Sequence, residues 1–526
     1  MKFGRGFLMM IVFTIQNLIL YSNTYYVATD GADINIGTKA EPLASVQKAQ
    51  EKVVAGDTVY IRGGDYIMQE SDISKVESSI FACVTYLDKS GSEGKRINYW
   101  AYPGETPHFI YNAVKPVNQR VVGFYIKGSN LHLKGLELTG IQVTILTHTE
   151  SYCIYSRGSN NIFEQISMHD NVGTGLRHYK GGYNLFLNCD SYRNHDNVSE
   201  DQKGGNNDGF GCHPDAGGKG NVFKGCRAWF NSDDGFDCIR ADESIIFDSC
   251  WAFNNGYSPD FESLGDGNGF KAGGYAYDEE SAIPLPVPSN TIQFCMAVHN
   301  KANGFYSNHH LNGNTWYNNS AYKNAINYNM VNRESPQSQN INVNGYNHIL
   351  KNNLGYAGRV KEYDYIDFTL CTVENNYFDY TITANDFVSL DESLLTAPRN
   401  EDGSLPRIDF MRIADSSIVI DKGQDIGFSF FGDAPDLGAF ESNIEVSINK
   451  IETKNNNDIF PNPVNDYLNL PDINIKKVLI FDISGKIYFP EISDNRINFS
   501  NFNNGIYIIN IISADDQNNK KILVKK

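Results

Sequence analysis

The chain has 526 residues, enough for one large domain and a small one. Its abundant Gly, Tyr and Phe are typical of a β-rich protein with many turns. The formal net charge of −18 argues against nucleic acid as a partner, because phosphate backbones bind basic surfaces, but it allows an anionic polymer held through a metal ion.

The first 23 residues have the pattern of a secretory signal peptide. Lys2 and Arg5 form a basic end, residues 7–20 form an apolar run, and cleavage is expected near residues 22–24, although the usual small-residue cleavage pattern is absent. No later stretch is long and apolar enough to span a membrane. Export often brings disulfides, yet the nine cysteines have no compact framework, so we expect another role for them.

A strand, a loop, an amphipathic helix and a second strand are predicted next. The helix is expected over about residues 42–54, where Leu43, Val46 and Val53 fall near one face. At this place a short helix would cap the open end of the repeat stack that follows, which would otherwise expose core and strand edges.

Six similar short segments lie between residues 161 and 324, and weaker copies begin at Asn130 and Asn347. Their third position holds a large apolar side chain: Phe163, Phe186, Phe223, Phe247, Ile292 and Trp316. Their last position is asparagine: Asn171, Asn194, Asn231, Asn255, Asn300 and Asn324. Four carry cysteine at the sixth position: Cys189, Cys226, Cys250 and Cys295. The closing asparagines are 23, 37, 24, 45 and 24 residues apart, so two intervals carry insertions into a period of 23–24 residues.

This period predicts stacked coils of short strands, because apolar and small residues alternate with the period of a strand. The predicted fold is all-β: a right-handed parallel β-helix over residues 24–445 with the short N-terminal capping helix, plus a small C-terminal β-sandwich-like domain. We expect the cysteines to form an inward stack of small buried side chains rather than disulfides or metal ligands. The closing asparagines are expected to form a ladder of side-chain amides from coil to coil.

The two insertions cover residues 195–220 and 256–289, and loops on a rigid coil stack are where function is expected. A second register runs through the coils: Thr174-Gly175-Leu176, Asp208-Gly209-Phe210, Asp234-Gly235-Phe236, Asn268-Gly269-Phe270 and Asn303-Gly304-Phe305. If the glycines align, equivalent residues stack about 4.8 Å apart and Asp208 lies over Asp234. The residues two after the last four glycines are Gly211, Asp237, Lys271 and Tyr306, so Lys271 follows Asp237 by one coil.

Four carboxylates should therefore meet on one patch, those of Asp208, Asp233, Asp234 and Asp237. They would repel unless some were protonated or a cation bound, and oxygen ligands of this number favour Ca²⁺ over zinc or copper. A structural cluster of Asp/Asn turns is the alternative. Lys271 could be an ordinary surface lysine, but beside a divalent cation and partly buried its pKa would fall toward that of a base.

Residues 446–458 are a predicted polar linker, and residues 459–526 form the small C-terminal domain. This domain resembles the type IX secretion sorting domain of Bacteroidota through Pro461-Asn462-Pro463, Asp482-Ile483-Ser484-Gly485-Lys486 and Asn504-Gly505-Ile506-Tyr507. The resemblance implies export by the type IX machinery across the outer membrane of a Gram-negative bacterium, followed by release or surface anchoring. A carbohydrate-binding or purely structural sandwich is the alternative.

Residues 24–440 resemble polysaccharide lyase family 9, most strongly through "NNDGFG", "NSDDGFD", "GDGNGFKAGG" and "NKANGFYSNHH". The resemblance implies that the four aspartates bind Ca²⁺ and that Lys271 is the Brønsted base. It also implies β-elimination in an anionic pectic polysaccharide, either homogalacturonan or rhamnogalacturonan I. No residue stands out as the acid for the leaving oxygen, and water can serve. We expect a monomer.

Substrate binding would need basic groups for successive carboxylates, and the candidates are Lys219, Arg240, His309 and His310. The aromatic residues Tyr275, Tyr277 and Tyr306 would suit apolar sugar faces. His309 and His310 could equally be surface residues of the coil turns.

Two other functions remain open from the sequence. A polygalacturonase-type hydrolase would use Asp233 and Asp234 as acid and base, but this leaves Lys271 unexplained and requires no Ca²⁺. A non-catalytic surface binding protein would use Ca²⁺ only to stiffen its coils, and it would tolerate loss of Lys271.

Overall fold

The computed structural model of the chain forms two compact units, which divide between residues 444 and 445. The residues that it describes are 22–275, 280–338, 341–442, 464, 466–470, 475–482, 487–488, 490–493, 495–502, 505–513 and 517–524. The predicted signal peptide up to residue 21, the predicted linker, Tyr277 and residues 461–463 lie outside the described residues.

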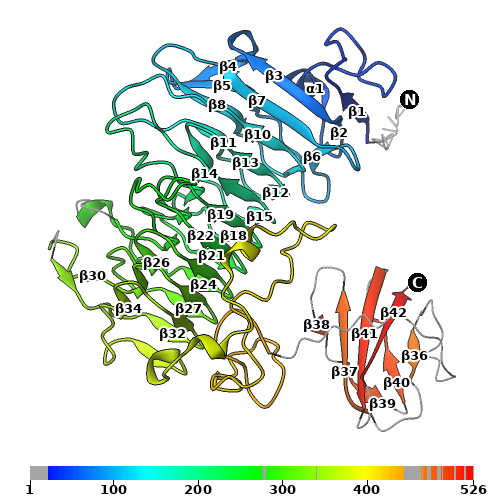
Figure 1. Cartoon of the computed structure of the whole chain (residues 1–526). Helices are drawn as coiled ribbons and strands as arrows, with labels where there is room; N and C mark the ends of the chain where they lie inside the picture. Colours follow the sequence, from blue (N-terminus) through cyan, green and yellow to red (C-terminus); the bar gives the residue numbers. More distant parts are fainter. Residues whose placement is uncertain are drawn as a thin grey trace, which may run out of the picture. The chain divides into compact units, whose positions relative to one another are not determined.

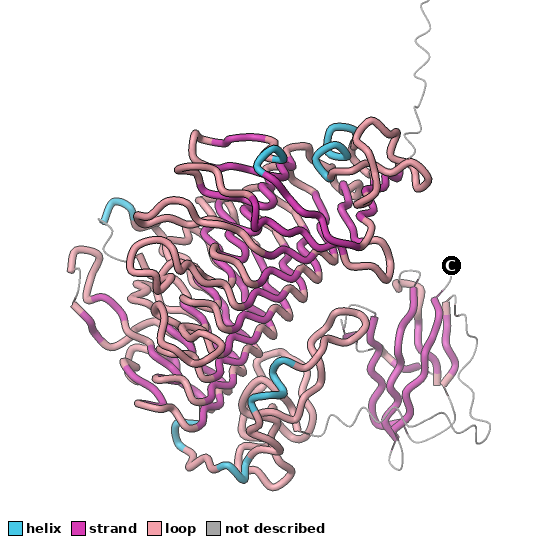
Figure 2. The backbone as a smooth tube through the Cα atoms, turned by 45° about the horizontal axis from the view of Figure 1, so that its top comes forward, coloured by secondary structure: helices cyan, strands magenta, loops and turns pink. Residues whose placement is uncertain are grey.

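Three long sheets form the N-terminal unit, and successive coils add successive strands to each of them (Figures 1 and 2). Sheet A consists of β1 (Thr24–Val27), β2 (Thr58–Ile61), β6 (Ile97–Ala101), β9 (Leu131–Lys134), β12 (Ile162–Glu164), β15 (Leu185–Leu187), β18 (Asn221–Lys224), β21 (Ile245–Asp248), β24 (Thr291–Gln293), β27 (Thr315–Tyr317), β32 (Ile349–Lys351) and β35 (Thr372–Glu374).

Sheet B consists of β3 (Gly64–Gln69), β7 (Pro107–Ala113), β10 (Glu137–Thr139), β13 (Ser167–His169), β16 (Asp190–Tyr192), β19 (Arg227–Trp229), β22 (Trp251–Phe253), β25 (Met296–Val298), β28 (Ser320–Tyr322) and β33 (Leu354–Tyr356). Sheet C consists of β4 (Lys75–Glu77), β5 (Phe81–Leu87), β8 (Arg120–Ile126), β11 (Tyr152–Ser156), β14 (Thr174–Tyr179), β17 (Phe210–His213), β20 (Phe236–Asp237), β23 (Phe270–Lys271), β26 (Asn303–Tyr306), β29 (Ile326–Asn329) and β34 (Lys361–Asp364). Neighbouring strands of sheet C are parallel except β4 and β5.

The predicted capping helix is α1 (Val46–Lys52), which contacts β1, β2 and β5 at the N-terminal end of the stack. Its first turn is capped by Ser45, whose Oγ accepts a hydrogen bond of 3.0 Å from the backbone N–H of Lys48. The helix is shorter than predicted at its start, because Leu43 already pairs with Val27 as an extension of the sheet.

Aromatic and cysteine side chains fill the inside of the coils, as predicted. Phe163, Phe186 and Phe223 lie in register, with ring centroids 5.0 and 4.2 Å apart. All nine cysteines are buried and free. The thiol of Cys226 donates to the backbone carbonyl of Phe186 in the preceding coil at 3.3 Å, so the cysteine stack is a packing element and the predicted inward position is confirmed.

The predicted asparagine ladder is also present. Asn171 donates through Nδ2 to Oδ1 of Asn194 at 2.9 Å, and the same bond continues through Asn231, Asn255, Asn300 and Asn324. These amides are fully or almost fully buried, and their bonds satisfy groups that would otherwise be costly to bury.

After the last coil, residues 380–442 form a segment that we call the C-terminal strap, which packs against sheet B. Arg399 of the strap pairs with Asp190 of β16, and Phe410 packs on Tyr322 of β28 at a centroid distance of 5.7 Å. The strap and its surroundings include the short helices η3 (Tyr377–Asp379), η4 (Ala384–Asp386) and η5 (Glu392–Thr396). The remaining short elements are η1 (Glu70–Asp72), η2 (Glu280–Ala282), β30 (Asn332–Arg333) and β31 (Asn342–Val343).

The C-terminal unit is a separate small β-domain with two antiparallel sheets. One holds β36 (Tyr467–Asn469), β39 (Ile492–Ser493) and β40 (Arg496–Asn498), and the other holds β37 (Ile475–Asp482), β38 (Ile487–Tyr488), β41 (Gly505–Ser513) and β42 (Gln517–Val524). Its own apolar core includes Leu468, Ile480, Ile497 and Ile509. None of the helices described in either unit is long and apolar enough to cross a membrane.

Candidate active site and metal centre

One row of residues on the outward face of sheet C takes one member from each coil. The part of this row at the candidate site consists, in chain order, of Tyr155, Arg177, Gly211, Asp237, Lys271 and Tyr306. On the inward face the matching row is aromatic, and Phe210, Phe236 and Phe270 stack at centroid distances of 5.1 and 4.8 Å. The Gly-Phe register predicted from the sequence is therefore the register of the sheet, and the packed core fixes the spacing of the outward side chains.

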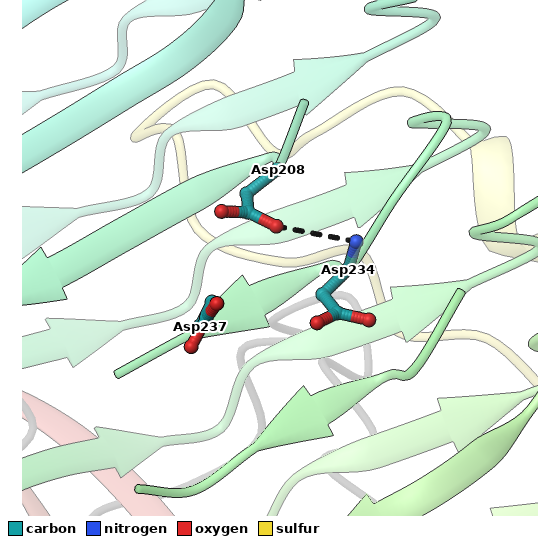
Figure 3. A group of neighbouring side chains, drawn as sticks. All are labelled: Asp208, Asp234 and Asp237. Carbon is teal, nitrogen blue, oxygen red and sulfur yellow. Dashed lines mark hydrogen bonds between the residues drawn. The ribbon is translucent and has the colours of Figure 1, made fainter. Parts of the chain in front are cut away.

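Three of the four predicted aspartates form one cluster (Figure 3). Each of Asp208, Asp234 and Asp237 offers a carboxylate oxygen, and these oxygens all lie within 4.8 Å of one another. Oδ1 of Asp208 accepts a hydrogen bond of 3.3 Å from the backbone N–H of Asp234. Oδ1 of Asp234 accepts two bonds from Asn268, at 2.7 and 2.8 Å. One oxygen of each carboxylate is thus oriented by the protein.

The fourth aspartate, Asp233, is buried beside this cluster rather than within it. Its Oδ1 accepts a hydrogen bond of 2.9 Å from the backbone N–H of Asp266, in the second insertion. Its charge still acts on the cluster and contributes to the raised pKa of Asp208. The structure therefore brings three aspartates together as possible metal ligands and keeps the fourth as a neighbouring charge.

Lys271 lies against the cluster. Its Nζ is 3.0 Å from Oδ2 of Asp234 and 3.1 Å from Oδ2 of Asp237, and its side chain is only 14% exposed. Burial alone would lower the pKa of Lys271, but the nearby carboxylates, led by Asp234 and Asp237, raise it well above its ordinary value. Without a cation, Lys271 is an ammonium ion held by two carboxylates.

The cluster carries more negative charge than Lys271 alone balances. Burial and mutual repulsion raise the pKa of Asp208 and Asp233 well above the ordinary aspartate value, and burial and Asp237 raise that of Asp234. Oδ2 of Asp234 is buried and lies 3.0 Å from Nζ of Lys271. Three carboxylates that share a single lysine leave negative charge unbalanced, and their oxygens are a donor set that fits a hard divalent cation such as Ca²⁺.

Four of the predicted substrate-binding residues have positions that a polymer could reach. Tyr306 follows Lys271 in the row and is half-buried. Arg240 is exposed in the turn after β20, and Lys219 is exposed in the turn after β17. His309 is partly exposed, and its Nε2 lies 2.8 Å from Oδ1 of Asn342.

The other two, Tyr275 and His310, are placed inside the protein. Their rings stack at a centroid distance of 5.9 Å, and the Tyr275 hydroxyl donates to the Ala241 carbonyl at 3.1 Å. Nδ1 of His310 accepts from the N–H of Gly274, and Nε2 donates to the carbonyl of Pro288. Burial lowers the pKa of His310 to about 4, so the ring is neutral. Both side chains are buried and hold the loop that follows Lys271.

Sequence reasoning missed three polar residues next to the cluster. Arg177 forms an ion pair with Glu150, and its charge and that of Asp208 interact. The side chain of His213 is buried and lies next to Gly211. The signal that could have found Arg177 was present, because it stands two residues after Gly175, in the register that led to Lys271.

Residues 25–353 match the family described as "Pel9A-like, right handed beta helix region". The chain belongs to this family. Residues 458–525 match a second family, described as "Secretion system C-terminal sorting domain". The predicted family, the right-handed β-helix and the sorting domain are thus confirmed, and the sorting domain marks the chain for export by type IX secretion.

Relatives of known activity cover most of the β-helix unit. Pectate lyase L of Dickeya chrysanthemi is 34% identical over 430 residues, which are 80% of this chain and 90% of that protein. Pectate lyase PEL9 of Emericella nidulans is 29% identical over 75% of this chain and 93% of that protein. A solved rhamnogalacturonan lyase aligns with a TM-score of 0.73 and 42% identity, covering 75% of this chain and 97% of that one. Pectate lyase Pel9A aligns with a TM-score of 0.63 and 32% identity, covering 80% and 96%. The predicted enzyme class, a polysaccharide lyase, is confirmed.

Proposed function

We propose that the protein is a Ca²⁺-dependent lyase that cleaves a pectic polysaccharide by β-elimination, with Lys271 as the base. The observation that carries the proposal is the contact between the aspartate cluster and Lys271. A lysine Nζ lies 3.0–3.1 Å from two carboxylates of an oxygen-only donor set, on the open face of a rigid sheet. A hydrolase needs paired carboxylates but no lysine between them.

Asp208, Asp234 and Asp237 would hold the cation, and Asp233 would add negative charge from the side. Ca²⁺, when bound, would attract the carboxylate of a uronate residue and withdraw charge from it, which makes the neighbouring C5–H more acidic. The rigid coils keep the three aspartates in place before any ligand arrives, so little reorganisation is required.

Lys271 would act as the proton acceptor. The carboxylates are the cause of its raised pKa, so neutralising them leaves burial as the dominant influence, and burial lowers the pKa of a lysine. The neutral amine at Nζ then takes the C5 proton. The C5 electron pair forms the C4–C5 double bond, the bond from C4 to the glycosidic oxygen breaks, and that oxygen takes a proton from water. The product ends in a 4,5-unsaturated uronate.

The substrate would be homogalacturonan or rhamnogalacturonan I. Similarity to both pectate lyases and a rhamnogalacturonan lyase supports a pectic polymer. Tyr306, Arg240, Lys219 and His309 would contact it, because these predicted residues lie at the surface or are partly exposed. Tyr275 and His310 would act indirectly, by supporting the loop after Lys271.

The test is to incubate the purified protein with polygalacturonate and, separately, with rhamnogalacturonan I, with added Ca²⁺ or with a chelator, and to follow the ultraviolet absorbance of the unsaturated product. Absorbance that needs both Ca²⁺ and Lys271 is expected. Lys271→Ala should reduce the rate about 10³-fold, whereas Lys323→Ala is the matched control, since Lys323 pairs with Glu392 at 2.9 Å away from the cluster. New reducing ends without ultraviolet absorbance would identify a hydrolase, and Ca²⁺-dependent binding without any cleavage would identify a binding protein.

A further inference from the structure

A glycine interrupts the row of side chains on the outward face of sheet C. Gly211 stands between Arg177 on one side and Asp237 on the other. A Cβ atom added to Gly211 would lie 2.9 Å from Nε2 of His213 and 3.6 Å from Cγ of Arg177. The absence of a side chain at Gly211 therefore lets the His213 ring and the Arg177 side chain lie against the main chain there, next to the aspartate cluster.

His213 presents an unused hydrogen-bond acceptor beside Gly211. Its side chain is buried, and its Nδ1 lies 2.6 Å from the carbonyl oxygen of Ile239, which can only accept, so Nδ1 carries the hydrogen. Nε2 then has a free lone pair, and it has no partner within the described residues. An unsatisfied buried acceptor is costly and indicates that a donor from outside the chain completes the site.

Arg177 presents unused donors from the other side. Its guanidinium bonds to Glu150 through Nη1, and Glu150 is itself held by the Tyr152 hydroxyl at 2.6 Å. Among the described residues Glu150 is the only hydrogen-bond partner of this guanidinium, which also lies over the Tyr152 ring at 6.0 Å from its centroid, and the Arg177 side chain is 26% exposed. One end of the guanidinium is thus anchored, and the edge formed by Nε and Nη2 remains available to a carboxylate, which binds such an edge with two parallel hydrogen bonds.

We infer that Arg177, Gly211 and His213 form a subsite for a second uronate residue of the polymer, with the carboxylate on Arg177 and a sugar hydroxyl donating to Nε2 of His213. This inference rests on the proposed function and adds a specificity determinant to it. Arg177 is two coil spacings, about 10 Å, from Asp237 along the row. A pyranose residue is about as long as one coil spacing. Two coil spacings therefore correspond to two sugar residues. In homogalacturonan and in a polymer whose uronates alternate with neutral sugars alike, a uronate at the cation is followed two sugar residues away by another uronate, whose carboxylate could reach Arg177.

The test measures kcat, KM and Ca²⁺ affinity for the full-length protein and for three variants, with polygalacturonate and a rhamnogalacturonan I preparation as substrates. Arg177→Gln should raise KM about 10- to 100-fold, the value of a lost charge-assisted bond, and change kcat less than about threefold. Ca²⁺ affinity should not fall, because the variant loses a positive charge that interacts with Asp208. Arg177→Lys, which keeps the charge, should recover part of the lost affinity. Arg193→Gln is the matched control, because Arg193 forms a similar ion pair with Asp170 over the ring of Tyr192 on sheet B.

An unchanged KM in Arg177→Gln would overturn the inference, as would a parallel loss of kcat and Ca²⁺ affinity, which would mean that Arg177 only supports the cluster. Should that variant not fold, Gly211→Ala answers the same question, since its methyl group would come within 2.9 Å of Nε2 of His213 and displace that ring from the proposed subsite. KM should rise, and an unaltered KM in the folded variant would refute the subsite. If the wild type forms no unsaturated product, the proposed function fails, and calorimetric titration with tetragalacturonate still decides the inference. Weaker binding by Arg177→Gln than by wild type supports the subsite, and equal or absent binding rejects it.

Discussion

Asp190 on sheet B and the aspartate cluster on sheet C, which are both largely removed from water, have opposite charge balance. On sheet B, Asp190 is paired with Arg227 at 2.8 Å and with Arg399 of the C-terminal strap at 2.6 Å. Burial raises the pKa of Asp190, but the two arginines outweigh burial and hold the pKa below its usual value. On sheet C, Asp234 shares one lysine with its neighbours, and burial and repulsion raise its pKa.

The comparison separates burial from function. Both carboxylates are largely removed from water, so burial alone identifies neither as a site. The sheet B group is complete within the chain and stabilises the fold. The sheet C group has unbalanced negative charge within the chain. This charge lowers the stability of the fold unless a ligand supplies the missing positive charge.

The largest expected effect is on catalysis. Asp234→Asn should lower the rate of unsaturated-product formation about 10²- to 10³-fold, because it removes a charge from the proposed cation site. Asp190→Asn, the matched change on sheet B, should leave the rate per folded molecule unchanged. Initial rates at saturating Ca²⁺ measure both. Equal losses in the two variants would remove the distinction between the two groups.

The second effect is on stability, and here the substitution on sheet B is expected to have the larger effect. Asp190→Asn should reduce the free energy of unfolding by about 3–5 kcal/mol, since it leaves two buried arginines without their partner. Asp234→Asn, measured in chelator, should cost nothing or increase stability, because it relieves repulsion among the aspartates. Urea denaturation followed by circular dichroism gives both values, and a destabilised Asp234→Asn would show that the cluster is already balanced.

The third effect is a pH dependence. The folded-state pKa values of Asp208 and Asp234 are raised above the unfolded-state value of about 4, so the folded chain binds more protons than the unfolded chain above that pH. Stability from this group is therefore present at acid pH and is lost as the pH rises. In chelator the melting temperature should fall as pH rises above about 4, while saturating Ca²⁺ should reduce this slope. Asp190, with its lowered pKa, contributes stability that is lost only as the pH falls below about 4.

Melting curves of the Asp208→Asn/Asp234→Asn double variant provide the control for the pH prediction. Its slope in chelator should be close to that of the Ca²⁺-loaded wild type. A wild-type slope that is the same with and without Ca²⁺ would contradict the assignment of the pH dependence to the cluster.

The smallest effect concerns the asparagine ladder, which is complete within the chain like the Asp190 group. Asn255→Ala should cost about 1–3 kcal/mol, because Asn255 accepts from Asn231 and donates to Asn300 in the interior. Asn312→Ala, at an exposed position, should change the free energy of unfolding by less than about 0.5 kcal/mol. Chemical denaturation measures both, and similar values would mean that the buried amides contribute little.

The fold and the row of residues on sheet C could be predicted because both follow the coil period. Phe210, Phe236 and Phe270 repeat with their glycines, and this register alone places Asp237 beside Lys271. Positions that do not repeat could not be predicted. The strap has no period, so its pairing of Arg399 with Asp190, far apart in the sequence, left no pattern. The burial of His310 depends on Pro288 in an insertion, and no repeat predicts how an insertion folds.

The row on sheet C limits where coils can be inserted or deleted during the evolution of such a protein. Each member of the row comes from a different coil, so the distances between them are set by main-chain hydrogen bonding and not by loops. Coils gained or lost at either end of the stack would leave the spacing of this row unchanged. A single coil inserted between β17 and β20 would move Asp208 away from Asp234 by one more strand spacing and so break up the aspartate cluster. The number of coils between β17 and β20 is therefore fixed, whereas the number of coils at the two ends of the stack can vary.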